Sequence, residues 1–376
     1  MLYTIPDYYQ KFHCIAGDCE ETCCAGWQIV ADPASLKRYR REKGPYRNTL
    51  KEKIDWKNSC FKQDEDRRCA FLNKDNLCEM YINIGEKSLC RTCTRYPRHI
   101  EEFEDSREIT LSVSCPEVAR ILMSHLEPVT FQTVEKEGEE EYEDFDPFLF
   151  DKLLDAREVL YRILQNRALP VKIRMGLSYG LVRDFQRRIN HEDLFSTDGV
   201  LEKYQKPAAR AFVEKMTKAA EAENAYLFIK EMFHKLFQLE LLREDWGLLL
   251  LETEKRLFLD MDAGTYRTLT EEFLQWMEEH DMHWEIRKEQ LLVYFVSTYF
   301  CGAVYDGEAL SKMQMALLSV DFVEELLKAK WLRNEKSLDD EELVELVYRY
   351  SREVEHSDYN LKKLEEMMPV ENGSFC

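Results

Sequence analysis

The segment Cys19-Glu20-Glu21-Thr22-Cys23-Cys24-Ala25-Gly26-Trp27 brings three cysteines close together near the start of a chain of 376 residues. Ten of the twelve cysteines lie within the first 115 residues, and only Cys301 and Cys376 come later. Thiols at this density either pair as disulfides or bind metal. The abrupt fall in cysteine content therefore predicts a separate cysteine-rich module at the N-terminal end.

The redox compartment decides between these two uses of the thiols. The first residues, MLYTIPDYYQKFHC, show no basic segment followed by an apolar run, so a secretory signal is not expected. No stretch approaches the ~18 consecutive apolar residues of a membrane-spanning helix. We therefore expect a cytoplasmic protein without a membrane partner, in which thiols stay reduced. Metal binding is favoured, and a disulfide scaffold in a secreted protein is the alternative.

The charge is distributed unevenly along the chain. Residues 1–125 hold 20 basic and 20 acidic side chains, whereas residues 126–376 hold 32 basic and 52 acidic ones. The whole net charge of −20 therefore lies in the second part. Because such a field repels phosphate groups, a nucleic-acid partner is not expected.

The spacing of the cysteines indicates metal ligands. Cys90-x2-Cys93 lets two thiolates converge on one ion, whereas the adjacent Cys23 and Cys24 point in different directions and can hardly share a site without strain. Four sulfurs suffice for one zinc ion or iron–sulfur cluster, so the candidates allow two sites or one site with bystanders. The candidate metal ligands are Cys14, Cys19, Cys23, Cys24, Cys69, Cys78, Cys90, Cys93 and Cys115.

An acidic segment marks the end of the module. Eight of the twelve residues from Glu135 to Asp146 are acidic, which is typical of a solvated linker. We predict a cysteine-rich metal or iron–sulfur module over 1–125, an acidic linker over 126–146 and an all-α domain over 147–376. Within the module, Ile82–Ile84 and Thr110–Val113 are expected to be strands, and Pro116–His125 a helix that begins with proline.

The second part of the chain shows the periodicity of amphipathic helices. Apolar residues recur at helical spacing from Leu153 to Leu164. Ser337 is expected to cap a helix that has Asp339 and Asp340 in its first turn. The predicted fold is mainly α, a small cysteine-rich module followed by helices. The other segments with this periodicity are 208–218, 225–242, 266–277, 285–300, 309–329 and 338–350.

Four motifs resemble the flagellin lysine N-methylase family, which is related to the CxxCxxCC group of zinc- or iron-chelating proteins. They are the opening segment Cys19–Trp27, Cys69-Ala70-Phe71-Leu72, Thr92-Cys93-Thr94-Arg95-Tyr96-Pro97-Arg98 and Ser114-Cys115-Pro116-Glu117. A later match is Tyr350–Ser357, which contains Glu355 and His356. The resemblance spans nearly the whole chain.

The resemblance implies an enzyme that transfers methyl groups from S-adenosylmethionine to lysine ε-amines of flagellin. It also implies an iron–sulfur cluster, [4Fe–4S], on the cysteine module, with zinc as the alternative metal. By position, the implied ligands come from eight of the nine candidate cysteines, and Cys90 is the less secure ninth. Glu355-His356 is expected in the active cleft between the module and the helices.

The sequence itself indicates neither a catalytic base nor a binding site for the methyl donor. The chain contains no G-x-G, so a Rossmann-type methyltransferase is not expected. The C-x3-C-x2-C pattern of radical enzymes is also missing, because Cys24 follows Cys23 directly. Two non-catalytic alternatives stay open: a metal or iron–sulfur carrier, and an adaptor whose zinc holds the module together.

Overall fold

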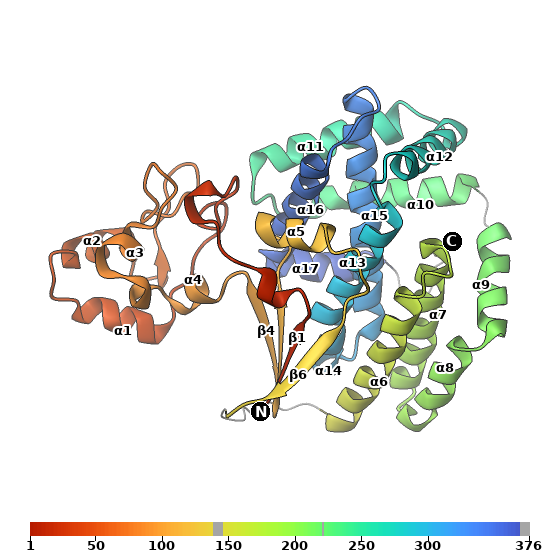
Figure 1. Cartoon of the computed structure of the whole chain (residues 1–376), viewed down its shortest axis with the longest axis horizontal. Coiled ribbons are helices and arrows are strands. Elements are labelled where there is room, and N and C mark those ends of the chain that lie inside the picture. The colour runs from red at the N-terminus through yellow and green to blue at the C-terminus, as the bar shows by residue number, and fades with distance from the viewer. Residues whose placement is uncertain (138–145, 220–221, 369–376) are drawn as a thin grey trace.

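The computed structural model describes residues 1–137, 146–219 and 222–368, and helices dominate it (Figure 1). The expected mainly-α fold is thus confirmed. From Pro147 onward, the regular elements in the described residues are all helical. Most of the acidic run, together with Cys376, falls outside the described residues, and the limits predicted at residues 125 and 146 remain predictions.

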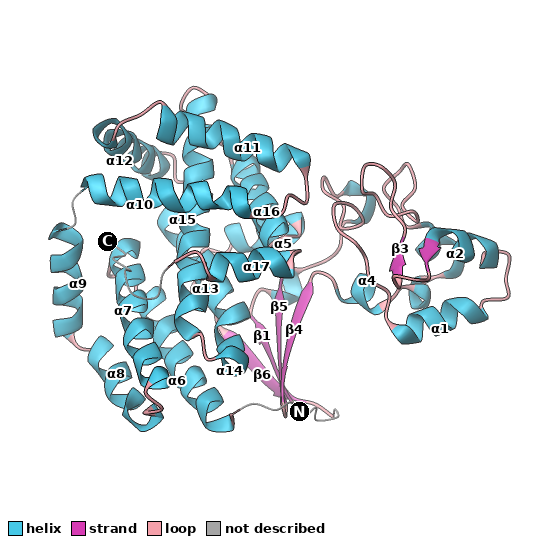
Figure 2. Ribbon diagram, turned by 180° about the vertical axis from the view of Figure 1, so that it is seen from behind, coloured by secondary structure: helices cyan, strands magenta, loops and turns pink. Residues whose placement is uncertain are grey.

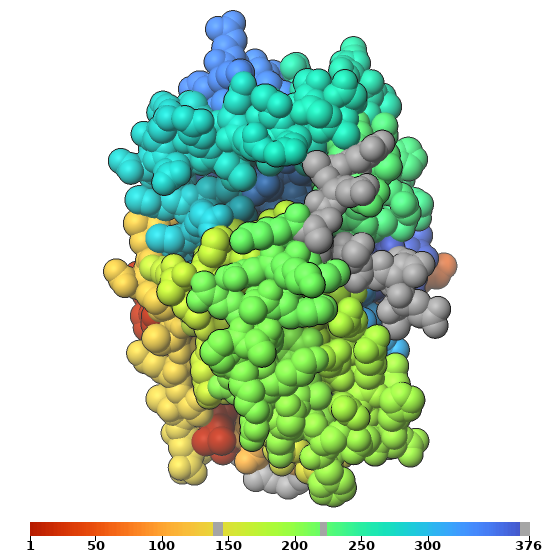
Figure 3. Space-filling view, turned by 90° about the vertical axis from the view of Figure 1, so that its right-hand side faces the viewer, coloured from red at the N-terminus to blue at the C-terminus, as the bar shows by residue number. Residues whose placement is uncertain are grey.

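The larger part of the molecule is a helical body. Two central helices, α13 (Trp284–Tyr299) and α15 (Ala309–Arg333), are buried on nearly all sides, as expected for helices that are apolar all round. The helices are α6 (Pro147–Leu164), α7 (Val171–Asn190), α8 (Thr197–Tyr204), α9 (Pro207–Ala219), α10 (Ala222–Lys235), α11 (Glu244–Glu254), α12 (Ala263–Glu279), α13 (Trp284–Tyr299), α14 (Ala303–Asp306), α15 (Ala309–Arg333), α16 (Asp340–Glu355) and α17 (Asp358–Glu365). In a space-filling view, the segments around α8–α9 and α11–α12 form two blocks of one face (Figure 3).

A four-stranded sheet lies beside the helical body (Figure 2). Its order is β4 (Arg98–Phe103), β5 (Ser106–Leu111), β1 (Leu2–Pro6) and β6 (Phe131–Glu135). β1 runs parallel to β5, with Leu2 opposite Ser106, and antiparallel to β6. The core of the helical body also takes in Phe103, Leu111 and Val129. The sheet and the helices therefore form one packing unit.

Two local strand predictions need correction. Residues 82–84 end helix α3 (Glu79–Ile84) instead of forming a strand, because the chain turns at Gly85, whose positive φ of 82° stops the helix. The strand expected over Thr110–Val113 lies earlier, and β5 ends at Leu111. The helix expected from Pro116 is confirmed as α5 (Pro116–Met123), with proline in its first turn.

The residues between β1 and β4 form a separate small lobe, seen apart from the helical body in Figure 1. We call residues 14–96 the cysteine-rich lobe. Its own apolar core includes Leu36, Leu50, Phe61, Phe71 and Met80. Its elements are α1 (Pro33–Arg41), α2 (Arg47–Lys53), β2 (Ile54–Asp55), β3 (Cys60–Phe61), α3 and α4 (Arg91–Arg95).

The cap of α16 differs from the predicted one. Ser337 is exposed and lies two residues before the cap, which is Asp339. The Asp339 carboxylate accepts from the backbone of Glu342 at 2.8 Å, and the Glu342 carboxylate accepts from the backbone of Asp339 at 3.3 Å. This reciprocal pair is a capping box.

The capping box gives a stability prediction. We expect Asp339→Ala to lower the free energy of unfolding by about 1 kcal/mol, because the backbone N–H of Glu342 at the start of α16 loses its partner. Ser337→Ala is the matched control and should change it by less than about 0.5 kcal/mol. Urea unfolding of the two variants beside the parent chain measures both values. Equal effects of the two substitutions would contradict the assignment of the cap.

Candidate functional site

Three aromatic rings meet where the cysteine-rich lobe contacts the helical body. Trp27 and Tyr96 come from the lobe, and His356 follows α16. The ring centroids lie 4.8 Å apart for Trp27 and His356, 5.7 Å for Tyr96 and His356, and 5.8 Å for Trp27 and Tyr96. All three side chains are half-buried, so each still reaches solvent. We call this place the junction site.

His356 is held at the junction as a neutral ring. Its Nε2 lies 2.9 Å from the hydroxyl of Ser114, which is also 3.1 Å from the Tyr96 hydroxyl. Burial lowers the pKa of His356 to about 3, and the positive charge of Arg352 adds to this effect. At neutral pH the imidazole is therefore uncharged and takes part in a hydroxyl network.

Glu355, the residue before His356, ends α16 with its carboxylate among three hydroxyl groups. The hydroxyls of Tyr294 and Tyr299 donate to its Oε2 at 2.5 and 2.6 Å, and Ser351 donates to its Oε1. Burial raises the pKa of Glu355, although the three hydroxyl donors work in the opposite direction. The residue as a whole is half-buried, and a carboxylate with a raised pKa is a candidate for proton transfer.

Arg352 ties the opening cysteine segment to α16. Its guanidinium is buried and donates to three backbone carbonyls, those of Glu21 at 3.1 Å, Thr22 at 3.2 Å and Ala25 at 2.8 Å. These three bonds fix the turn that carries Cys23 and Cys24. Arg352 itself lies one helical turn before His356. The cysteine segment and the junction site therefore share one anchor.

The structure distributes the candidate ligands over two regions. Cys69 and Cys90 belong to the core of the cysteine-rich lobe, and Cys24, Cys78 and Cys93 pack against that core. Cys115 instead begins α5 in the core of the helical body. Cys14 is exposed, whereas Cys19 and Cys23 are half-buried. All eleven cysteines within the described residues are free thiols, so no disulfide joins any of them.

Two pairs of thiols interact directly. A hydrogen bond from Cys23 lowers the pKa of Cys24 to about 7 and raises that of Cys23. In the same way, Cys93 lowers the pKa of Cys90 to about 7, and the pKa of Cys93 rises. Each pair therefore offers one thiolate near neutral pH, which is the form that binds metal.

The thiols are not gathered at ligand distance. In the part of the chain that the structure describes, no three Cys, His, Asp or Glu side chains converge closely enough to hold a metal ion. The donor chemistry fits zinc or an iron–sulfur cluster, since all nine candidate ligands are cysteines. Binding of a metal ion or cluster would thus require several of these sulfur atoms to move closer together.

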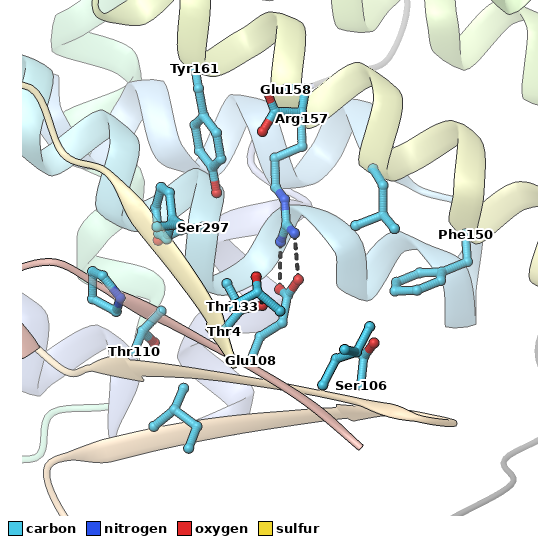
Figure 4. A pocket seen from close by; sticks show the side chains of 15 residues that line it. Thr4, Ser106, Glu108, Thr110, Thr133, Phe150, Arg157, Glu158, Tyr161 and Ser297 are labelled. Carbon is cyan, nitrogen blue, oxygen red and sulfur yellow. Dashed lines mark hydrogen bonds and ion pairs between the residues drawn. The ribbon is translucent and has the colours of Figure 1, made fainter. Parts of the chain in front are cut away.

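A cavity of about 310 Å³ lies between the sheet and α6 (Figure 4). Arg157 reaches from α6 across it and donates to both oxygens of Glu108 on β5, at 2.5 Å each. Hydroxyls of Thr4, Thr133 and Ser297 line the same space. Its two inner charges already satisfy each other, so the cavity offers mainly hydroxyl hydrogen bonds to a small polar molecule.

Sequence reasoning found part of the junction site and missed the rest. It singled out Glu355 and His356, and it quoted the motifs that hold Tyr96 and Ser114, although only for their cysteines. A tyrosine before Pro97 and a serine before Cys115 were the available signal. Tyr294 and Tyr299 gave no such signal, because they lie in α13, where nearly all the other residues belong to the buried core.

The helical body and cysteine-rich lobe define a class of helical proteins with an appended thiol-rich segment. The family model of the FliB lysine N-methylase C-terminal domain matches residues 157–375. Since this match covers more than half of the chain, the protein belongs to that family, and the resemblance noted from the motifs is confirmed. No solved structure matches the chain.

Curated relatives match a shorter part of the chain. A lysine-N-methylase of Salmonella typhimurium is 30% identical over 128 residues, which cover 32% of each chain. The flagellar biosynthetic protein FliU of Salmonella muenchen is also 30% identical over 128 residues, 32% of this chain and 76% of FliU. The match thus spans about a third of the lysine-N-methylase. In the described residues, no helix has the length and apolarity needed to cross a membrane.

The buried His356 gives a pH prediction. Its pKa of about 3 in the folded protein lies below the ~6.5 of an unfolded histidine, so its contribution to stability is complete above about pH 6.5 and is lost as the pH falls toward 3. We expect the difference in free energy of unfolding between the parent chain and His356→Gln to shrink by up to about 1.4 kcal/mol per pH unit on acidification.

Urea unfolding at about pH 7 and about pH 5 measures this change. His191→Gln is the control, because His191 is exposed at the end of α7. A difference for His356→Gln that does not depend on pH would show that the ring is not held neutral by burial.

Proposed function

We propose that this protein is an S-adenosylmethionine-dependent protein-lysine N-methyltransferase whose substrate is flagellin. The observation that carries the proposal is the half-buried residue Glu355, whose pKa is raised by burial and whose neighbour in sequence, His356, belongs to the junction site. Two further findings support it. The chain belongs to the FliB lysine N-methylase family, and two of its relatives are named for lysine methylation and for flagellar biosynthesis.

Methyl transfer requires a neutral amine, although a free lysine has a pKa of roughly 10.4. In the proposed reaction the substrate ammonium first meets the Glu355 carboxylate, which attracts it and accepts one of its protons. The nitrogen lone pair then forms the N–C bond while the C–S bond of the donor breaks, leaving the neutral thioether. Burial raises the pKa of Glu355, which makes it a better proton acceptor than an exposed glutamate.

The rings of the junction site suit the rest of a lysine side chain. Trp27 and Tyr96 are half-buried, so they can pack against its methylene groups. Aromatic faces also attract an ammonium group before its proton is lost. Removal of water from the amine by these rings favours the neutral form. The net charge of −20 adds a general attraction for basic substrates.

For the cofactor we propose a [4Fe–4S] cluster held by the cysteine thiolates, with zinc as the alternative. Cys24 and Cys90 are the best-prepared donors, since a partner thiol lowers the pKa of each to about 7. A cluster bound there supplies rigidity to the lobe and, if one iron lacks a protein ligand, a Lewis-acid site for the methyl donor. Cys60 is buried, and Gln28 donates to its sulfur at 3.0 Å.

A methylation assay tests the proposal. The protein is purified without oxygen, and its iron, zinc and acid-labile sulfide are measured before it is mixed with flagellin and S-adenosylmethionine carrying a radioactive methyl group. We expect label on flagellin, located by mass spectrometry on lysine side chains. As a control, flagellin with its lysines acetylated should take up no label. Absence of transfer from protein that holds stoichiometric zinc, with no binding of the donor, would favour the adaptor.

A further inference from the structure

The cavity between the sheet and α6 is large enough for a small organic ligand. Its volume of about 310 Å³ lies at the lower end of the range of natural ligand pockets, ~300–1,000 Å³. Residues of β1, β5, β6 and α6 line it, together with Ser297 of α13. Its lining includes no cysteine and none of the rings of the junction site. We call this separate feature of the molecule the sheet cavity.

A buried hydroxyl group without a partner points into the sheet cavity. Tyr161 of α6 is only 9% exposed, and its side chain extends toward the space above the sheet (Figure 4). In the described part of the chain, no other group forms a hydrogen bond with this hydroxyl. Burial raises the pKa of Tyr161, so the hydroxyl keeps its proton at neutral pH and can donate as well as accept. A polar ligand would supply the partner that buried polar groups normally have.

The sheet side of the cavity carries a pair of threonine hydroxyls. Thr4 of β1 and Thr133 of β6 lie opposite each other in the strand pairing, and their Oγ1 atoms are 2.9 Å apart. One of the two protons forms the hydrogen bond between them, so the other remains to donate, and both oxygens can still accept. Such a pair suits the two neighbouring hydroxyls of a ribose ring, because each side can both donate and accept.

The ion pair inside the cavity adds acceptors without offering a free positive charge. Arg157 donates once to each carboxylate oxygen of Glu108. A carboxylate has about four lone-pair positions, so Glu108 can also accept from a ligand hydroxyl while the ion pair stays intact. Ser297 donates to the carbonyl of Tyr294 at 2.8 Å, and its oxygen can accept as well. These groups favour a neutral ligand with hydroxyls over an anion.

Aromatic rings give the cavity an apolar part. Phe131 stacks on Tyr161, with ring centroids 4.8 Å apart and an interplanar angle of 16°. Tyr161 and Phe150 lie on opposite sides of the ion pair between Arg157 and Glu108 (Figure 4). Aromatic side chains contact flat, apolar ring systems favourably. Hydroxyls for a sugar and rings for a base are therefore present in one cavity.

We propose that the sheet cavity binds a ribonucleoside. The threonine pair and Glu108 bind the ribose hydroxyls, Tyr161 donates to another polar atom of the ligand, and the aromatic rings contact the base. Two sources share this chemistry, a free nucleoside and the nucleoside part of S-adenosylmethionine. The inference concerns the class of ligand, goes beyond the proposed function and does not depend on methyl transfer.

The sheet cavity and the candidate catalytic carboxylate adjoin the same stretch of α13. Ser297, which lines the cavity, lies three residues after Tyr294 and two residues before Tyr299. The hydroxyls of these two tyrosines donate to Glu355. A ligand in the sheet cavity would thus contact the helix that positions this carboxylate.

Isothermal titration calorimetry tests the proposal on the full chain, purified without oxygen. The probes are adenosine, S-adenosylhomocysteine, D-ribose and dideoxyadenosine, which lacks both hydroxyls of the ribose ring. We expect adenosine to bind, and dideoxyadenosine to bind at least about tenfold more weakly because the threonine pair loses its partners. Tighter binding of S-adenosylhomocysteine than of adenosine would support the methyl donor as the source, and the reverse order would support a free nucleoside.

Three results of the titration would overturn the proposal. The first is that adenosine does not bind, which would leave the cavity to water. The second is equal affinity for adenosine and dideoxyadenosine, which would exclude recognition of the ribose hydroxyls. The third is that ribose binds as tightly as adenosine, which would assign the cavity to a sugar.

Two variants show whether the nucleoside binds in this cavity. Tyr161→Phe and Thr133→Val each remove one hydroxyl and keep the size of the side chain, and each should raise Kd for adenosine by about threefold to tenfold. Tyr226→Phe is the matched control. Tyr226 is also buried, but its hydroxyl donates to the carbonyls of Phe258 and Met261, outside the cavity, so Kd should not change. Parent affinity in either cavity variant would overturn the proposal.

A measurement on the unaltered chain covers the case in which a variant does not fold. The protein is irradiated with azidoadenosine, a photoreactive nucleoside, and the labelled peptides are found by mass spectrometry. We expect label on β1, β5, β6 or α6, and excess adenosine should abolish it. Label confined to the cysteine-rich lobe or the junction site would overturn the proposal. Methylation is not measured, so a chain that binds adenosine here but does not methylate flagellin would contradict only the proposed function.

Discussion

We expect Glu355→Gln to lower the rate of methyl transfer by at least about 100-fold, within the range for loss of a general base. Glutamine keeps the size of the side chain and can still accept from Tyr294 and Tyr299, but it neither attracts the lysine ammonium nor takes its proton. The measurement is kcat/KM for methylation of flagellin, with the circular dichroism spectrum as a check on folding.

The pH profile separates a base from a structural group. Because burial raises the pKa of Glu355, the carboxylate is lost at a higher pH than for an exposed glutamate, and kcat/KM of the parent enzyme should fall on acidification through that raised pKa. This acidic limb should be absent in Glu355→Gln. Glu366→Gln, on the exposed face of the chain after α17, is the control and should retain the parent rate and profile. A parent-like rate in Glu355→Gln would remove this residue from the mechanism.

The second large effect is expected on the contact between the cysteine segment and α16. Arg352→Gln should lower the free energy of unfolding by at least about 3 kcal/mol, because three buried carbonyls, those of Glu21, Thr22 and Ala25, lose a charged donor. It should also raise the pKa of Cys24, which the charge of Arg352 helps to lower. Urea unfolding and the alkylation rate of Cys24 measure the two effects.

Arg349→Gln is the matched control for this contact. Arg349 lies on the same helix, but it pairs with Glu345 at 3.0 Å and Asp245 at 2.9 Å near the surface. Its loss should cost less than about 1 kcal/mol, as for other surface ion pairs. Limited proteolysis after Lys11 should become faster only in Arg352→Gln, since the released cysteine segment follows that bond. Equal destabilisation by both substitutions would contradict the anchoring role of Arg352.

The amphipathic helices of the second part could be predicted because each buries one face, which leaves a period of 3.6 in the sequence. The sheet could not. β1 has only five residues, and its partners begin at Ser106 and Phe131, more than 100 positions away. Pairing at such a distance leaves no local pattern. Ile82 was misread for the opposite reason, because its β-branched side chain favours a strand while the turn at Gly85 ends a short helix.

The candidate site divides in the same way. Cysteine spacing marked the loops that carry the candidate ligands, and the run Tyr350–Ser357 marked Glu355 and His356. The partners of Glu355 come from α13, where Tyr294 lies 61 positions away and Tyr299 lies 56 positions away. Their hydroxyls donate to the Glu355 carboxylate, which only tertiary packing brings close to them.

The position of β1 inside the sheet has a consequence for the order of folding during synthesis. β1 lies between β5 and β6, so residues 2–6 leave the ribosome long before either partner strand exists. The cysteine-rich lobe is complete in the meantime, since all of it precedes β4. Contacts between distant segments close slowly. The nascent lobe can therefore fold while β1, which precedes it in the chain, still waits for residues 106–135.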